Sequence, residues 1–213
     1  MTKKPNAKQI VLLGLLTAIL LVMSYTPLGY LNIGPLAITF NVIPVAIAGI
    51  ALGPVGGAIV GGVFGLTSFL QCIGVGGISV MGATLFAIDP FLAFVQRFIP
   101  RVLDGLLVGF VYKGARKLVG SGIACFITGF CAAFFNTVLF MTALVLLFSN
   151  TEYMQELIAG QNIFIFVCTF VGINSVFEMI ASTLITGAVG IVLIKAKLIE
   201  GGSLKKQKAQ QVE

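Results

Sequence analysis

Long uncharged apolar runs dominate this chain. Gln9 to Ile88 contains no Asp, Glu, Lys or Arg, and residues 118–151, 157–177 and 179–194 are equally free of these side chains. A helix of roughly 20 apolar residues crosses the hydrocarbon core of a bilayer. Alternating strand patterns are absent, so helices rather than a barrel must satisfy the backbone in lipid. The pattern therefore predicts an all-α integral membrane protein.

Glycine, proline and charged residues divide the apolar runs into six predicted transmembrane helices within a single domain, 1–213. We expect helices over about 9–27, 41–52, 55–71, 90–113, 121–148 and 162–195, followed by a basic tail, 196–213. Gly53-Pro54 is a strong turn signal between the second helix and the third. The fourth helix begins either at Pro90, with Asp89 as its N-cap, or afresh at Pro100, and the sequence leaves both open.

The third predicted helix carries a row of small residues. Gly57, Gly61 and Gly65 recur at four-residue spacing, which places them on one helical face. Such rows let membrane helices pack backbone against backbone. We therefore expect this helix to lie unusually close to a neighbour. The segment that follows it, up to Asp89, is expected to be a glycine-rich connection.

Composition excludes several classes of function. The chain is 58% hydrophobic and 9% charged, it has no histidine, and its four cysteines lie singly among apolar residues. These features remove the commonest general base and zinc ligand, so we expect no metal and no cofactor in this chain. No G-x-x-x-x-G-K-[ST] motif occurs, so any ATP would be used by a separate subunit. The net charge of +6 indicates membrane topology and no nucleic-acid partner.

The distribution of cations predicts the orientation. With six spans, both termini share one face with the turns near 52–55 and 113–120. That face holds eleven of the thirteen cations: Lys3, Lys4, Lys8, Lys113, Arg116, Lys117, Lys195, Lys197, Lys205, Lys206 and Lys208. The positive-inside rule makes it cytoplasmic. Arg97 and Arg101 are the exceptions, because they fall toward the outer side and a topological rule does not explain them.

Polar residues inside the predicted spans gather in the outer half. Their depths, counted at about 1.5 Å per residue, place together Gln71, Arg97, Arg101, Asn136, Asn174 and Glu178. Such groups are costly in lipid and usually mark a partner or a pathway. An arginine fork suits a carboxylate, and amides suit hydroxyl or amide groups of a ligand. These six residues are our candidate substrate-binding set.

Five of the six candidates also have a purely structural interpretation. Arg101 lies three residues from Asp104 and could pair with it, and Arg97 could extend toward lipid headgroups. Glu178 could be a hydrogen-bonded packing residue, and the two asparagines could bond each other between helices. The sequence leaves these alternatives open.

The stretch "ITFNVIPVAIAGIALGPVGGAIVGGVFGLTSF", residues 38–69, together with "PRVLDGLLVGFVYK" and "FFNTVLFM", resembles a known family. It is similar to the substrate-binding S-components of energy-coupling factor (ECF) vitamin transporters, most of all the pantothenate-specific branch. The resemblance covers nearly all of residues 9–195. It implies a six-helix bundle with cytoplasmic termini and an outward-facing pocket, in the plasma membrane of a prokaryote.

The resemblance also implies partners. S-components capture a small-molecule vitamin outside and deliver it inward with a shared transmembrane coupling protein and two ECF ATPases. The first helix is implied to dock the coupling protein through Gly14 and Ala18, where the family commonly has alanine at both positions. The segment 28–40 is implied to help close the outer site.

Several rival functions are weighed against this one. Folate, niacin, riboflavin or cobalamin are alternative vitamins, because an arginine suits more than one of them. An ion or proton channel could use Glu178 and Arg101 as pore groups. A membrane enzyme lacks the necessary motifs: neither a phosphatidyltransferase D-G-x-x-A-R start nor the paired acids of an intramembrane protease is present. We therefore predict a binding subunit for transport that is not an enzyme.

Overall fold

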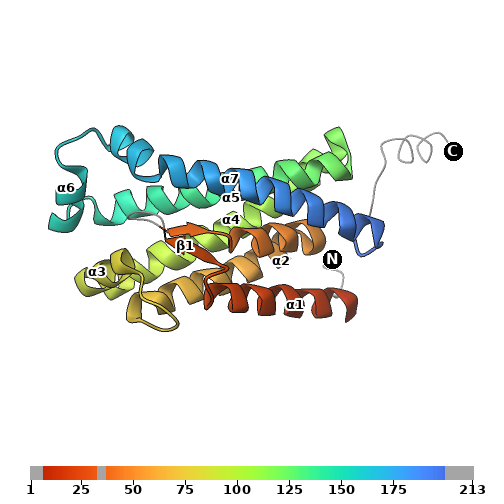
Figure 1. Ribbon diagram of the computed structural model, residues 1–213, viewed down its shortest axis with the longest axis horizontal. Helices are drawn as coiled ribbons and strands as arrows, with labels where there is room; N and C mark the ends of the chain where they lie inside the picture. The colour runs from red at the N-terminus through yellow and green to blue at the C-terminus, as the bar shows by residue number, and fades with distance from the viewer. Residues whose placement is uncertain (1–6, 33–36, 200–213) are drawn as a thin grey trace.

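The computed structural model describes residues 7–32 and 37–199. Its elements in chain order are α1 (Ala7–Ser24), β1 (Tyr30–Asn32), β2 (Ala37–Thr39), α2 (Val42–Leu70), the 3-10 turn η1 (Gln71–Ile73), α3 (Val80–Ile88), α4 (Pro90–Val119), α5 (Ser121–Phe148), α6 (Glu152–Ile158) and α7 (Ile163–Lys195). The long helices run side by side along the longest axis (Figure 1). The start of α1, the end of α7 and the α4–α5 turn share one end of the bundle, whereas α3 and α6 lie at the other.

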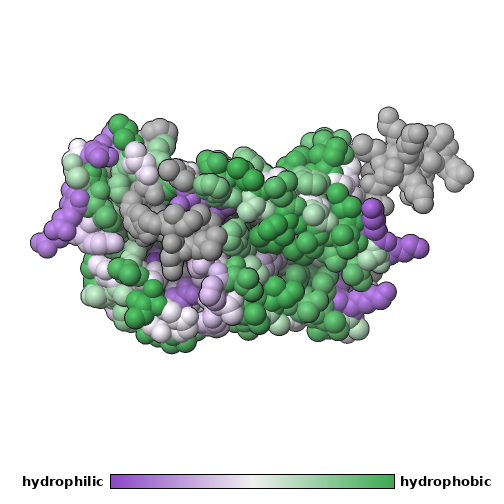
Figure 2. All heavy atoms as spheres, viewed as in Figure 1, coloured by the Kyte–Doolittle hydropathy of each residue, from purple (hydrophilic) through white to green (hydrophobic). Residues whose placement is uncertain are grey.

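Four described segments are long and apolar enough to cross a membrane: Ala7–Ser24, Val42–Ile73, Ser121–Phe148 and Asn174–Lys195. α4 is also long, with 30 residues, but Arg97, Arg101 and Asp104 interrupt its apolar sequence. Apolar side chains cover the middle of the face shown in Figure 2, and hydrophilic ones gather at both ends. This arrangement is that of a helical, multi-pass membrane protein.

α2 consists of two helical halves that reverse direction at Gly53. That residue has φ 76° and ψ −169°, a combination that is essentially restricted to glycine, and Pro54 follows it. A Cβ built on Gly57 would lie 3.2 Å from the Cα of Gly49. In an uninterrupted helix, residues eight apart are separated by about 12 Å along the axis. The turn predicted at Gly53-Pro54 is therefore confirmed.

The second half of α2 packs directly on the backbone of α4. Cβ atoms added at Gly57, Gly61 and Gly65 would meet backbone atoms of Gly105, Arg101 and Phe98, respectively. No side chain separates the two helices at these three points, as the glycine row predicted. The close approach fixes the position of α4 along α2, and with it the height at which the side chains of α4 project from the bundle.

α4 is one continuous helix that begins at Pro90. Asp89 Oδ1 accepts hydrogen bonds from the N–H groups of Phe91, at 2.9 Å, and Leu92, at 3.0 Å. The helix passes through Pro100 and ends at Val119, where Gly120 turns the chain with φ 84°. The alternative of a fresh start at Pro100 is wrong. The predicted end at 113 is six residues too early, because no glycine within α4 has a positive φ and Gly120 is the first one after it begins.

The sequence did not predict β1, β2 or α3. The chain is not purely α-helical, because β1 and β2 form a two-stranded antiparallel sheet in which Tyr30 pairs with Thr39. The expected glycine-rich connection contains α3, whose N-cap Ser79 accepts a hydrogen bond from Gly82 N at 3.2 Å. The sequence predicts a short helical turn in the loop 150–162, and α6 lies there, capped in the same way by Thr151.

α5 is the central helix for the site, because it packs against both α4 and α7. Its contact with α7 is close at Gly129, where an added Cβ would overlap the carbonyl oxygen of Ser182. The Ser182 hydroxyl donates to Gly129 O at 2.8 Å in the same contact. α5 therefore connects α4 and α7 within the bundle.

Candidate functional site

A cavity of about 660 Å³ lies among α2, α4, α5 and α7, bounded also by the end of α1, the sheet and the segment before α3. All six residues of the candidate substrate-binding set line it: Gln71, Arg97, Arg101, Asn136, Asn174 and Glu178. They come from four different parts of the chain, so only the tertiary fold brings them together. Their role in binding stays a prediction.

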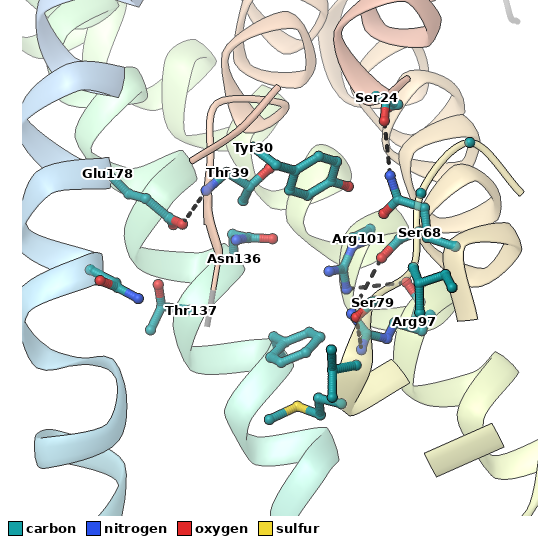
Figure 3. Close-up of a pocket in the computed structure, with 18 of the residues that line it drawn as sticks. Ser24, Tyr30, Thr39, Ser68, Ser79, Arg97, Arg101, Asn136, Thr137 and Glu178 are labelled. Atoms are coloured by element: carbon teal, nitrogen blue, oxygen red, sulfur yellow. Dashed lines mark hydrogen bonds between the residues drawn. The ribbon is translucent and has the colours of Figure 1, made fainter. Parts of the chain in front are cut away.

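Two buried arginines on α4 form one side of the cavity. Arg97 donates from Nη1 to Ser68 Oγ at 3.5 Å and from Nη2 to Ser79 Oγ at 3.4 Å. Arg101 donates from Nη1 to the carbonyl oxygen of Arg97 at 3.2 Å. The Nε atoms of both arginines have no hydrogen-bond partner in the described part of the chain. We call these four residues, Ser68, Ser79, Arg97 and Arg101, the arginine wall (Figure 3).

Aromatic rings hold the two guanidinium groups in place. The Cζ atom of Arg101 lies 4.7 Å from the ring centroid of Phe64 and 4.8 Å from that of Phe140. Arg97 Cζ lies 5.1 Å from the same Phe140 ring. The face of an aromatic ring attracts a cation without neutralising it. The rings therefore orient both guanidinium groups and leave their positive charge available to a ligand.

Asp104 forms no hydrogen bond with the arginine wall. Its side chain is 0% exposed, and within the described residues neither of its oxygens has a hydrogen-bond partner. Because Arg101 turns instead toward Arg97 and the two phenylalanines, the pairing of Arg101 with Asp104 considered above is wrong. The interpretation that Arg97 extends toward lipid headgroups is also wrong, because its side chain is buried and its guanidinium donates hydrogen bonds to two serines.

Glu178 lies away from the arginines, on α7. Its Oε1 accepts a hydrogen bond from the backbone N–H of Thr39 at 2.7 Å, which ties the sheet to α7. We call Glu178 and Thr39 the glutamate wall. Figure 3 shows Asn136 between this wall and the arginines. Asn136 lines the cavity, and its Oδ1 is buried without a hydrogen-bond partner among the described residues.

Gln71 has a structural bond as well as a place on the cavity. Its Nε2 donates to the carbonyl oxygen of Ser24 at 2.8 Å, at the last residue of α1. The Ser24 hydroxyl in turn lies 3.2 Å from that of Thr67. Gln71 therefore attaches the end of α1 to α2 beside the site.

Gly14 and Ala18 are separate from this cavity. Both lie on the exposed face of α1, and nothing approaches within 4 Å of a Cβ added at Gly14. The structure thus divides the predicted functional residues into a buried polar group and an exposed small-residue face.

Sequence reasoning missed several residues that line the cavity. Tyr30 and Thr39 belong to the sheet, Ser68 and Ser79 hold Arg97, and Phe140 lies beneath both arginines. Ser79 precedes an apolar run, which is an N-cap signal that could have located α3.

Burial raises the pKa of the Tyr30 hydroxyl, so this group remains a neutral hydrogen-bond donor. Residues 33–36 of the expected closing segment lie outside the described residues.

We expect Asp104→Asn to leave ligand affinity within about threefold of the wild-type value. The reason is that Asp104 makes no bond to Arg101, and amide and carboxyl have nearly the same size. Equilibrium binding to the purified variant measures this directly. A loss of about 100-fold, the size we expect when Arg101 itself is replaced by alanine, would show that the two residues act as a pair.

The chemistry of the cavity suits an organic anion with additional polar groups. Two guanidinium groups that lack a carboxylate partner among the described residues favour a carboxylate, which Arg can bind through two parallel hydrogen bonds. Asn136, Asn174 and the Tyr30 hydroxyl add amide and hydroxyl chemistry. Much of the remaining lining is apolar, as in most small-molecule sites.

Comparison with known proteins gives consistent matches over most of the chain. Residues 8–190 match the family model described as ECF transporter, substrate-specific component. The chain is 31% identical to the pantothenic acid transporter PanT of Lactococcus lactis over 209 aligned residues. This alignment covers 92% of this chain and 98% of that protein. It is 32% identical over 177 residues to the pantothenate transporter PanT of Leuconostoc mesenteroides, covering 81% of this chain and 82% of the relative.

Proposed function

This chain belongs to the family of ECF transporter substrate-specific components, and we propose that it is the pantothenate-binding subunit of such a transporter. Members of this family are transport components, so the protein is not an enzyme. The observation that carries the choice of ligand is the pair of buried arginines that no described carboxylate neutralises, in a chain whose relatives are named as pantothenate transporters.

Pantothenate carries one carboxylate, one amide and two hydroxyl groups, and the cavity offers a complement to each. Arg101 and Arg97 would bind the carboxylate through charge-assisted hydrogen bonds. Asn136 and Asn174 would bind the amide and hydroxyl groups. Phe140 and Met141 add apolar surface for the methyl groups of the ligand. A volume of about 660 Å³ falls within the range of pockets that enclose small organic molecules.

The proposed topology has six membrane crossings with both termini in the cytoplasm. The two halves of α2, which reverse at Gly53, supply two crossings, and α1, α4, α5 and α7 supply four. The described cations outside the cavity are Lys8, Lys113, Arg116, Lys117, Lys195 and Lys197, and their segments lie at the end of the bundle where α1 starts and α7 ends. This asymmetry supports a cytoplasmic location for that end, which leaves the cavity in the outer half.

The proposed partners are a shared transmembrane coupling protein and two ATPases, which would use ATP on behalf of this subunit. The exposed face of α1 around Gly14 and Ala18 is the proposed docking surface for the coupling protein. Small residues there would let a partner helix approach closely. The proposed location is the plasma membrane of a prokaryote.

Uptake of radiolabelled pantothenate tests this function. Cells that lack their own pantothenate uptake are expected to accumulate the label only when this chain is expressed together with a coupling protein and its ATPases. Unlabelled pantothenate in excess should abolish the signal, whereas folate or niacin should not. Uptake that is unchanged when this chain is omitted would contradict the proposal.

A further inference from the structure

We infer that Glu178 makes the cavity selective for unphosphorylated pantothenate over its phosphate ester. The inference rests on the proposed function, because it requires pantothenate to occupy this cavity. It concerns the glutamate wall, whose carboxylate faces the same cavity as the two arginines but from a different helix.

The two walls belong to two different helices that both pack against α5. Arg97 and Arg101 project from α4, Glu178 projects from α7, and α5 packs against both of these helices. In Figure 3, Glu178 and Thr39 lie on one side, the arginines on the other, and Asn136 between them. The cavity therefore presents guanidinium, amide and carboxylate groups in that order.

Pantothenate has a matching order of groups along its length. Its carboxylate is at one end, its amide is central, and its two hydroxyls are at the other end. If the carboxylate binds the arginine wall, the amide lies near Asn136, which lines the cavity between the two walls. The hydroxyl end then meets Glu178. A hydroxyl can donate a hydrogen bond to a carboxylate oxygen, so this orientation satisfies both ends of the ligand.

Burial and a hydrogen bond hold the Glu178 side chain in place beside the cavity. Its side chain is 6% exposed, and Oε1 is engaged at 2.7 Å by the N–H of Thr39. The described cations that line the cavity are Arg97 and Arg101, both on the far wall. When the first anionic group of a ligand occupies these two arginines, a second anionic group beside Glu178 would therefore be repelled by its carboxylate.

Phosphorylation of the primary hydroxyl creates this conflict in either orientation. With its carboxylate on the arginines, the ester places its phosphate against Glu178. With its phosphate on the arginines, it places its carboxylate there instead. Repulsion between like charges in a buried site costs several kcal/mol, so we expect the ester to bind at least about 100-fold more weakly than pantothenate.

Competition binding tests the inference with the purified full-length protein and labelled pantothenate. Unlabelled pantothenate and 4′-phosphopantothenate are titrated against the label. Glu178→Gln removes the charge but keeps an oxygen that can accept from Thr39 N. In this variant the ratio of the two affinities is expected to fall at least about tenfold, while pantothenate itself binds within about tenfold of wild type. Glu156→Gln, an exposed glutamate on α6, is the matched control and should keep the wild-type ratio.

Glu178→Met separates charge from the anchoring of the sheet. It removes the charge and also the bond to Thr39, so both ligands are expected to bind more weakly, but the ratio should fall as in Glu178→Gln. A merely structural role predicts equal weakening of both ligands and an unchanged ratio. An ester that binds wild type as tightly as pantothenate, or a ratio that neither substitution moves, overturns the inference. Absence of pantothenate binding to folded wild type overturns the proposed function itself.

Discussion

Replacing Arg101 with alanine is expected to weaken pantothenate binding by about 100-fold or more. The guanidinium is 5% exposed and rests against Phe64 and Phe140, and its only described hydrogen bond is to the carbonyl oxygen of Arg97. It is therefore already oriented, and a carboxylate ligand need not displace a competing anion. Truncating one partner of a buried, hydrogen-bonded charge pair costs roughly 2–5 kcal/mol. Isothermal titration calorimetry of the purified protein with pantothenate measures the effect.

Two further variants identify the origin of that loss. Arg101→Lys keeps the charge but not the planar fork, so it should recover only part of the affinity. Arg116→Ala removes the same type of side chain at the opposite end of α4 and should bind as wild type does. Wild-type affinity in a folded Arg101→Ala sample would show that the ligand carboxylate lies elsewhere.

Substituting alanine for Gly57 or for Gly105 is expected to be strongly destabilising. A Cβ on either residue would overlap the carbonyl oxygen of the other, so α2 and α4 must separate. Overpacking of this kind costs about 1–3 kcal/mol, even though alanine favours a helix over glycine by up to about 1 kcal/mol. We expect the melting temperature in detergent to fall by more than about 5 °C.

The same substitution elsewhere in α4 provides the control. Nothing lies within 4 Å of a Cβ added at Gly114, so Gly114→Ala should leave the melting temperature unchanged or raise it slightly. Gly57→Ala is also expected to weaken pantothenate binding, because displacement of α4 moves both arginines. A Gly57→Ala protein as stable as Gly114→Ala would contradict the backbone-to-backbone contact.

Much of the architecture could be predicted because it depends on local sequence. Runs free of charge predict helices long enough to cross a bilayer, and Gly53-Pro54 predicts the reversal inside α2. The row that includes Gly57 and Gly61 predicts close packing, since a bare Cα is the only way for two backbones to meet. Helical rise gave the depth of the polar residues, and the structure places all six around one cavity.

Strands of three residues were not predictable, because a segment as short as Tyr30–Asn32 shows no alternation to detect and is stabilised by its partner strand. The extension of α4 to Val119 was missed because charged residues such as Lys113 and Arg116 end a membrane span without ending a helix. A charged side chain is costly in lipid and so ends the membrane-spanning part, but it does not interrupt the backbone hydrogen bonds of the helix.

The sequence by itself determined that this is a helical membrane protein, where its chain reverses in α2 and which polar residues lie at a similar depth in the bundle. The tertiary structure decided which groups those residues contact. Arg101 turns to two phenylalanines instead of to Asp104 three residues away, and Glu178 bonds the backbone of Thr39. Helical periodicity determines from which face of a helix a side chain projects. Its rotamer depends on neighbouring residues of other helices, and these cannot be identified from the spacing of residues in the sequence.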